Sequence, residues 1–393
     1  MLATIKEPPP RSQEQHHGKS GKKRDPWVFH PYEITFSGFS GSGKTTLLSR
    51  LAGALSAQGR SVGYAKHDAH HFDVDHPGKD TFVLRQAGAS SVLINNAVSN
   101  AVIRSGPLDD LSRATALLDC DLVLVEGHKH NRALRKFILL DPAGEMAALL
   151  PSLPPEEVIA LITPDLSLAA GLPWPVLHRD DLPGILAAVD TEIARRIAAI
   201  PVHGLILSGG RSSRMGVDKG ALDYHGRSMI AQAATLLAPF CAEIRVSCRA
   251  EQTLPEDARH LTRLHDVFLD LGPAGGILSA FAQQPQASWL VFACDLPLVT
   301  PEALSRLCAG RNPLKFATAY TSTHDGFPEP LLALYEPKAR CRLLQFLALG
   351  KTCPRKMLIN SPTQLLPGYG SWLDNCNTPE ERQAALRQLN SPS

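Results

Sequence analysis

The chain has 393 residues, of which 44% are hydrophobic and 20% charged, and its formal net charge is +2. This near-neutral charge gives no electrostatic case for nucleic acid or an anionic membrane as the main partner, and no apolar run approaches the roughly 20 residues of a membrane-spanning helix. At roughly 150 residues per domain, the length predicts two or three domains.

Residues 1–31 are predicted to form a disordered tail. The stretch "MLATIKEPPPRSQEQHHGKSGKKRDP" is rich in Pro, Gln, Gly and Lys and lacks the apolar core of a secretion signal. Its "GKSGKKR" cluster is interpreted as part of a solvated tail, with weak anion binding as the alternative. The eight cysteines are scattered and include no CxxC pair, which favours the reducing cytoplasm and argues against a structural zinc site.

Residues 32–199 are predicted to form an α/β domain of the P-loop NTPase type. The strand "EITFS" is followed by "GFSGSGKTTLL" and then by an amphipathic helical pattern that ends at Gly59. The stretch "SVGYAK" is the next predicted strand. Four further runs, "SSVLI", "DLVLVEG", "KFILL" and "VIALIT", are candidates for buried strands, with helical stretches such as "LDDLSRATALLD" between several of them. This alternation predicts a mainly parallel sheet covered on both faces.

The motif beginning at Gly38 fits the P-loop pattern, in which backbone amides and a helix N-terminus surround phosphate oxygens. Its predicted nucleotide-binding residues are Gly38, Gly41, Gly43, Lys44, Thr45 and Thr46. We expect Lys44 to reach the β- and γ-phosphates and the hydroxyl of Thr45 to bind Mg²⁺. Glu126, at the end of "DLVLVE", is the candidate second metal residue. The alternatives are an incidental Gly/Ser loop and a salt-bridged strand-end carboxylate.

The segment "KHDAHHFDVDHPGKD" gathers histidines and aspartates between two predicted elements: His67, His70, His71, Asp73, Asp75, His76 and Asp80. Imidazole and carboxylate are adequate ligands for several divalent ions, but the spacing matches no compact zinc pattern. We interpret the segment as a mobile loop over the nucleotide, and direct metal binding is the alternative.

The blocks "FSGFSGSGKTTLL", "KHDAHHFDVDHPGKDTF", "RQAGAS" and "LVEGHKH" resemble the molybdopterin-guanine dinucleotide biosynthesis adapter family, MobB, over about residues 34–197. This resemblance implies a small P-loop GTPase with weak GTP hydrolysis, which helps a guanylyltransferase. The chain has no NKxD motif for reading guanine. Asp165, in "LITPD", is the candidate that could take this role.

Residues 200–393 are predicted to form a second α/β unit, closely linked to the first at Ile200–Pro201. A strand begins at Val202 and leads into "LILSGGRSSRMGVDKGAL", a glycine-rich loop without the GK[ST] ending. The runs "EIRVSC", "SWLVFACD", "KFATAYTS" and "PLLALYEP" are further strand candidates, interleaved with helical stretches.

The second loop has the features of a nucleotidyltransferase. Gly209 and Gly210, after Leu207, permit close backbone approach to a nucleotide, and Arg214 and Lys219 are the predicted catalytic cations that straddle a triphosphate and the departing pyrophosphate. A glycine turn with surface cations is the alternative.

Two aspartates follow at the ends of apolar runs. Asp295, in "LVFACDLPLVT", lies where a buried strand ends before Pro297, a natural place for a Mg²⁺-binding carboxylate. Asp266 precedes a "GPAGG" loop that could approach a base or ribose closely. A turn-capping aspartate is the alternative for Asp266.

The ordered blocks "LILSGGRSSRMGVDKGAL", "GPAGGILSAF", "ACDLPLV", "GFPEPLLALY" and "NCNTPEE" resemble the molybdenum cofactor guanylyltransferase family, MobA, over about residues 202–389. The resemblance implies a Rossmann-like fold and transfer of GMP from MgGTP to molybdopterin, the acceptor part of the molybdenum cofactor, with release of pyrophosphate. On this reading Asp295 binds Mg²⁺, Asp266 helps to read guanine, and Asn377 lies near the metal or the pterin phosphate.

One stretch departs from the MobA pattern. The run "IRVSCRAEQ" lacks the asparagine usual at a guanine-contacting place, so Ser247, Cys248 or Arg249 must substitute for it. Transfer of CMP to the same pterin therefore stays open as an alternative.

The sequence as a whole thus predicts a cytoplasmic fusion in which one half transfers a guanylyl group and the other binds GTP beside it. The partners are GTP and molybdopterin, and cofactor insertion proteins and molybdoenzyme chaperones are further candidates. We expect neither nucleic acid nor a membrane as a partner. Two rivals remain, namely a sugar-nucleotide pyrophosphorylase fused to a P-loop kinase, and a nucleotide-gated cofactor carrier or chaperone without transfer activity.

Overall fold

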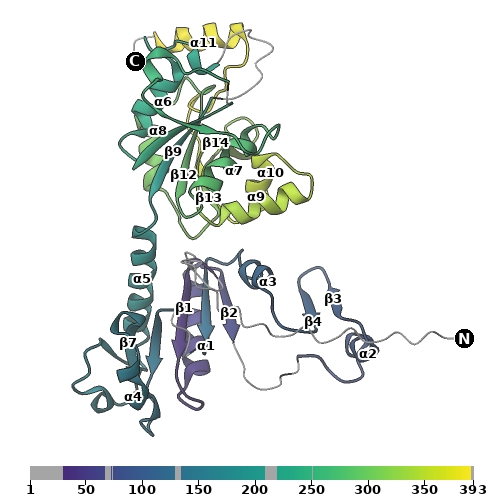
Figure 1. Ribbon diagram of the computed structural model, residues 1–393, viewed down its shortest axis with the longest axis vertical. Helices are drawn as coiled ribbons and strands as arrows, with labels where there is room; N and C mark the ends of the chain where they lie inside the picture. The colour runs from purple at the N-terminus through teal and green to yellow at the C-terminus, as the bar shows by residue number, and fades with distance from the viewer. Residues whose placement is uncertain are drawn as a thin grey trace, which may run out of the picture.

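The structure, a computed structural model, describes residues 30–66, 72, 74–128, 134–208, 219–249 and 251–390, with only the backbone at Lys219. These residues form two sheets with flanking helices, which follow one another along the chain (Figure 1). Helix α5 (Leu182–Ala198) packs on the first sheet, and strand β9 of the second sheet begins at Val202. The division into units at residues 32–199 and 200–393 stays a prediction.

The first sheet is parallel throughout, so the predicted mainly parallel sheet is confirmed. Six strands of the described residues follow the order β2-β5-β1-β6-β7-β8. Their bounds are β1 (Glu33–Ser37), β2 (Val62–Lys66), β5 (Leu122–Glu126), β6 (Lys136–Leu139), β7 (Val158–Thr163) and β8 (Val176–His178). Every residue of β1, β5 and β6 is buried, as is expected for inner strands of a sheet with two covered faces.

Strand β6 shows how the two faces are covered. Phe137 packs into a core with helix α1 (Lys44–Ala57) and helix α5, whereas Ile138 belongs to a second core that includes helix α4 (Glu145–Leu149). Successive side chains of a strand point to opposite faces. The apolar run "KFILL" therefore contributes side chains to both cores.

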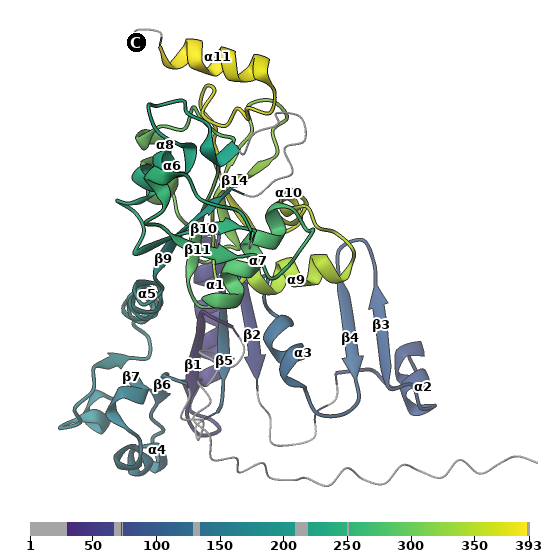
Figure 2. The same ribbon diagram turned by 45° about the horizontal axis from the view of Figure 1, so that its top comes forward.

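The prediction of "SSVLI" as a buried strand is wrong. It forms β3 (Ser91–Asn95), which pairs only with β4 (Asn100–Arg104) in a separate antiparallel hairpin among the described residues. The side chains of Leu93 and Ile94 are 67% and 54% exposed. Figure 2 shows this hairpin standing away from both sheets, between helices α2 (Asp80–Gln86) and α3 (Asp110–Thr115) along the chain. An apolar run has strand propensity, but only tertiary contacts decide which sheet it joins.

The second sheet is mixed. Within the described part of the chain it has seven strands in the order β11-β10-β9-β12-β14-β13-β15, and β14 runs antiparallel to both of its neighbours. The bounds are β9 (Val202–Leu207), β10 (Glu243–Cys248), β11 (Thr262–His265), β12 (Ser288–Ala293), β13 (Ala317–Thr321), β14 (Pro328–Tyr335) and β15 (Thr363–Pro367). The parallel part, β11-β10-β9-β12, is the Rossmann-like portion expected from the sequence.

The helices of the second half are α6 (Met229–Leu237), α7 (Pro273–Gln283), α8 (Pro301–Ala309), α9 (Ala339–Ala348), α10 (Pro354–Ile359) and α11 (Pro379–Leu389). Short 3-10 turns lie at Leu150–Ser152, Pro155–Glu157, Leu166–Ala169, Lys219–Ala221 and Glu256–Ala258. None of the helices that the structure describes combines the length and the apolar composition needed to cross a membrane.

The two halves meet through the amino ends of their sheets. Tyr32, just before β1, and Pro201 and Ala287, just before β9 and β12, line one cavity between the halves. The strands of both sheets therefore run away from the joint, and Figure 1 shows the arrow of β2 pointing away from the second half. Because parallel α/β sheets carry their ligand sites at the carboxyl ends of the strands, both predicted sites lie at the outer ends of the molecule.

Side chains from both halves stabilise this joint. Leu118, between α3 and β5, is buried in the core of the second half. Nζ of Lys315 lies 2.7 Å from Oδ1 of Asp121, and buried Lys338 donates to the carbonyl of Cys120 at 3.0 Å. The two halves, which the sequence predicts to be closely linked at Ile200–Pro201, thus also contact each other through a packed interface.

Candidate functional site

The P-loop lies between β1 and α1, where its backbone needs glycine. Gly41 and Gly43 have φ values of 79° and 87°, in the left-handed region that L side chains rarely adopt. A Cβ on Gly38 would lie 2.8 Å from the carbonyl oxygen of Leu139. Gly43 is also the N-cap of α1 and offers no side chain to cap it. The first-turn amides of α1 can therefore face a phosphate.

The amine of Lys44 lies across this loop. It donates to the carbonyl oxygens of Gly38 and Phe39 at 2.9 and 2.7 Å. The side chain is thus held on the inner side of the turn, at the point where a P-loop lysine meets phosphate oxygens. Thr45 and Thr46 follow, both exposed, in the first turn of α1.

Three side chains meet beside the P-loop, and the sequence indicated only two of them. The hydroxyl of Thr45 lies 3.3 Å from Oε2 of buried Glu126, and the phenol of Tyr64 donates to the same oxygen at 2.6 Å. A hydroxyl and a carboxylate beside a phosphate loop suit Mg²⁺, which takes few protein ligands and completes its shell with phosphates and water. Tyr64 lies on β2, which pairs with β5. This pairing joins segments that are far apart in the sequence, so no motif predicts the contact between Tyr64 and Glu126.

Arg179 is a second residue that sequence reasoning missed. It follows β8, and its amide donates to the carbonyl of Thr163 at the end of β7. A Cβ on Gly43 would lie 3.2 Å from its Nη1, so the guanidinium covers the loop from the side. Asp165, the candidate guanine reader, is exposed at the same edge, where it caps a 3-10 turn by accepting from the amide of Ser167 at 2.9 Å.

The histidine-rich loop falls mostly outside the described residues, which exclude His67, His70, His71 and Asp73. The part of this loop next to α2 is held by Asp75, which accepts a hydrogen bond from Thr81 at 2.9 Å and pairs with Arg85 at 3.2 Å. Within the described ranges, no group of three or more His, Cys, Asp or Glu could hold a metal ion. The metal alternative for this loop stays a prediction.

In the second half, β9 leads into the predicted transferase loop. Leu207 is buried at the end of β9, and Gly209, Gly210 and Arg214 lie outside the described residues, as does the side chain of Lys219. Ser208 donates to the carbonyl of Ser247 at 2.8 Å and fixes the start of the loop to strand β10.

Asp266 is paired with Ser247, one of the three residues expected to replace the missing asparagine. The hydroxyl of Ser247 donates to Oδ1 of Asp266 at 2.7 Å. Cys248 is fully buried beside Arg263, and Arg249 is exposed. Burial raises the pKa of Asp266 above its usual range, although the bond from Ser247 opposes this shift. Of the three candidates, Ser247 is therefore the one placed at Asp266.

The glycines of "GPAGG" have a different role from the one expected. Gly272 precedes α7, and Gly275 and Gly276 lie within its first turns. A Cβ on Gly275 would lie 2.3 Å from the carbonyl oxygen of Phe268, and one on Gly276 would lie 2.6 Å from Oγ of Ser247. Both glycines allow α7 to pack closely against its neighbours, because no side chain would fit there. Gly275 and Gly276 are thus residues of a packed helix and not of an open loop, and only Gly276 lies against Ser247.

Asp295 and the C-terminal block come together at the carboxyl edge of this sheet. Asp295 follows β12, and its backbone carbonyl accepts from the amide of Cys376 at 2.8 Å. Asn377 is the next residue, and Glu381 holds its amide at 2.6 Å. Buried Tyr224 belongs to the same region, and burial raises its pKa to about 12, so its phenol stays protonated at neutral pH.

The predicted sites of the two halves are far apart. Asp295 lies seven residues beyond the start of β12, and Gly38 lies six residues beyond Tyr32. At about 3.3 Å per strand residue, and with both sheets running outward from the joint, the two sites are on the order of 40 Å apart. The expectation that the P-loop binds GTP beside the transferase site is therefore wrong.

Two family models match the chain, one in each half. The model for the molybdopterin guanine dinucleotide synthesis protein B matches residues 34–164, and the model for the MobA-like NTP transferase domain matches residues 204–364.

Three curated relatives agree with these matches. A molybdenum cofactor biosynthesis bifunctional protein from Synechocystis sp. is 33% identical over 186 residues, which cover 47% of this chain and 54% of that protein. A molybdopterin-guanine dinucleotide biosynthesis adapter protein from Escherichia coli is 37% identical over 32% of this chain and 71% of its own length. A probable molybdenum cofactor guanylyltransferase from Synechococcus elongatus is 31% identical over 46% of this chain and 95% of its own length.

Proposed function

Because this chain belongs to the molybdopterin guanine dinucleotide synthesis protein B family through its first half and to the MobA-like NTP transferase family through its second, we propose that it transfers GMP from MgGTP to molybdopterin. The products are the guanine dinucleotide form of the molybdenum cofactor and pyrophosphate. The observation that carries this proposal is the meeting of Asp295 with the Asn377 block at the sheet edge where β9 enters its glycine-rich loop.

In the proposed reaction, an oxygen of the pterin's terminal phosphate forms a bond to the α-phosphorus of GTP. The bond from that phosphorus to the bridging oxygen of the β-phosphate breaks, and pyrophosphate leaves with the electron pair. Asp295 would hold Mg²⁺, which neutralises phosphate charge when bound. Arg214 and Lys219 are proposed to contact the triphosphate. Positioning supplies most of the rate, so no nucleophilic side chain is required.

Guanine selection is proposed to rest on the Ser247–Asp266 pair. A carboxylate accepts hydrogen bonds from the two adjacent donors on the guanine edge, which cytosine lacks. Ser247 keeps the carboxylate oriented, and the packing of α7 against Ser247 fixes both. This pair is the feature that favours guanine over the CMP alternative.

The first half is proposed to bind a GTP of its own and to hydrolyse it weakly, with Lys44 on the phosphates and with Thr45 and Glu126 near Mg²⁺. A separation on the order of 40 Å prevents a guanylyl group from passing directly between the sites. Assistance therefore acts through the interface or through further partners, for which cofactor insertion proteins and molybdoenzyme chaperones are candidates. All eight cysteines are free thiols, which supports a cytoplasmic location.

The test is to incubate the full chain with Mg²⁺, molybdenum-loaded molybdopterin and GTP, CTP or ATP in turn. Pyrophosphate release is measured together with the mass of the dinucleotide product. We expect pyrophosphate and a guanine dinucleotide with GTP alone. A product with CTP would overturn the base assignment at Asp266. Inorganic phosphate from GTP with no dinucleotide under any condition would favour the carrier alternative.

A further inference from the structure

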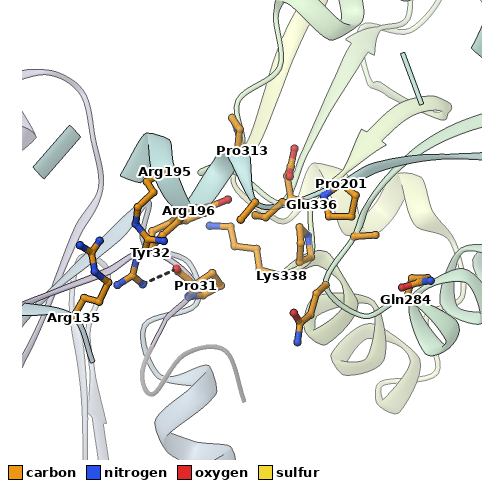
Figure 3. Close-up of a pocket in the computed structure, with 15 residues that line it drawn as sticks. Pro31, Tyr32, Arg135, Arg195, Arg196, Pro201, Gln284, Pro313, Glu336 and Lys338 are labelled. Carbon is orange, nitrogen blue, oxygen red and sulfur yellow. Dashed lines mark hydrogen bonds between the residues drawn. The ribbon is translucent and has the colours of Figure 1, made fainter. Parts of the chain in front are cut away.

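A cavity of about 530 Å³ lies between the two halves, at the amino ends of both sheets. This volume is within the range of about 300–1,000 Å³ that is usual for small-molecule sites. Figure 3 shows Arg135, Arg195 and Arg196 gathered on the side of the first half, with Lys338 and Glu336 facing them from the second. The cavity is remote from both sheet edges that carry the proposed nucleotide sites.

The first wall of the cavity has an excess of positive charge. Arg135, Arg195 and Arg196 all pair with one buried carboxylate, Glu192, and the latter two approach its Oε1 to 2.7 and 3.1 Å. One carboxylate neutralises one guanidinium, so about two positive charges remain. Holding three cations around one buried anion costs free energy through their mutual repulsion. An anion in the cavity would relieve this repulsion.

The second wall does not compensate this charge. Its carboxylate, Glu336, is already paired with Arg311 at 2.8 Å and accepts from Ser288 at 2.6 Å. Lys338 adds a further amine, and burial lowers its pKa to about 8. A bound anion would favour the charged form of this lysine.

A buried tyrosine also lines the cavity. The side chain of Tyr32 is 2% exposed, and its phenol has no hydrogen-bond partner among the described residues. A buried polar group without a partner is unusual and costs about 1–3 kcal/mol. Ile200, Pro313 and Ala287 add apolar surface beside it. The lining thus combines cations, a buried tyrosine and apolar walls, as is typical of a site for a small amphipathic anion.

We propose that the joint between the halves binds a small organic phosphate monoester, with the phosphate on Arg135 and Arg195 and the organic part against Tyr32 and the apolar walls. A phosphate monoester carries about −1.5 to −2 charges near neutral pH, which matches the uncompensated arginines. Arginine binds phosphate through paired N–H groups. Since residues of both halves line the site, its occupant contacts both and stabilises their docked arrangement. This site is independent of the proposed transferase function.

The test uses phenyl phosphate as the probe and the full chain at low ionic strength, with calorimetric titration. The double variant Arg135→Gln/Arg195→Gln leaves Arg196 on Glu192. We expect it to bind the probe at least tenfold more weakly than the parent. Arg60→Gln is the matched control. Arg60 pairs at 2.5 Å with Asp190 of α5, the helix that also carries Arg195, but Arg60 does not line the cavity. Its affinity should stay within twofold of the parent.

A second variant tests the site in case the double arginine variant loses binding only because it misfolds. Ala199→Trp fills the cavity without any change of charge, and it should also weaken binding at least tenfold while the thermal unfolding midpoint stays within a few degrees. Equal affinity for phenyl phosphate in the parent, the double arginine variant and Ala199→Trp would overturn the site. Equal affinity of the parent for inorganic phosphate and phenyl phosphate would overturn the organic part of the proposal.

Discussion

The phenol of Tyr64 donates a hydrogen bond of 2.6 Å to Oε2 of Glu126, the oxygen that also lies 3.3 Å from the hydroxyl of Thr45. The strand pairing of β2 with β5 sets this contact. Tyr64 thereby fixes the direction of the carboxylate proposed to order the metal and its water. Burial and Glu126 together raise the pKa of the phenol above its usual range, so it remains a donor at neutral pH.

Tyr64→Phe is expected to lower kcat of GTP hydrolysis by roughly tenfold, because a hydrogen bond to a charged group contributes about 1.5–3 kcal/mol. KM for GTP should change little, since the P-loop amides and Lys44 are untouched. Steady-state phosphate release measures both constants. Tyr369→Phe, a half-exposed tyrosine of the second half, is the control and should leave hydrolysis unchanged. An unaltered kcat in Tyr64→Phe would show that the contact has no role in hydrolysis.

The distance between the sites predicts separable losses of activity. Asp295→Ala should reduce guanylyl transfer by at least about a hundredfold, the magnitude expected when a main electrostatic contact to the transition state is removed. GTP hydrolysis by the first half should persist. Lys44→Ala should have the converse effect, with hydrolysis lost and the second half still able to release pyrophosphate. Both products are measured in one reaction, and retained transfer in Asp295→Ala would refute the metal assignment.

The Ser247–Asp266 pair predicts a pH effect. Burial raises the pKa of Asp266, so its carboxylate takes up a proton at a higher pH than an exposed aspartate does. The proposed contact to guanine should then be lost as pH falls through this pKa, and kcat/KM for GTP should fall with it. Ser247→Ala removes a donor that lowers the pKa. The acidic limb of the kcat/KM profile should therefore move to higher pH in this variant.

The matched control for this profile is Ser152→Ala, which changes an exposed serine of the first half. Its acidic limb should coincide with that of the parent chain. If the limb stays in place in Ser247→Ala as well, Asp266 does not titrate in the step that selects the base.

The joint predicts coupled unfolding of the two halves. Leu118 belongs to the first half along the chain but is buried in the core of the second. Leu118→Ala should cost about 2–5 kcal/mol through lost burial and a residual cavity. Scanning calorimetry should then resolve two transitions where the parent shows one. Leu111→Ala removes a leucine that is 74% exposed and should stay within about 0.5 kcal/mol of the parent. A single unshifted transition in Leu118→Ala would contradict a packed joint.

Local sequence was enough for the P-loop and for most strands. Gly43, for example, has a φ of 87°, and this backbone conformation depends on residues that are adjacent in the sequence. The sequence also placed Glu126 at the end of the buried run "DLVLVEG", but its partners Thr45 and Tyr64 come from other elements. The prediction of "SSVLI" as a buried strand is wrong, since its apolar pattern is equally compatible with a buried strand and with an exposed hairpin.

The sequence by itself determined that the chain has two glycine-rich motifs of different kinds, each following a strand, and that it alternates strands and helices. These features follow from residue types at short spacing. Only the tertiary structure decided that Tyr64 and Arg179 lie against the first loop, that Ser247 meets Asp266, and that the amino ends of the two sheets face each other. Strand order and domain docking depend on long-range burial and pairing, and no short pattern along the chain encodes which distant surfaces will exclude water together.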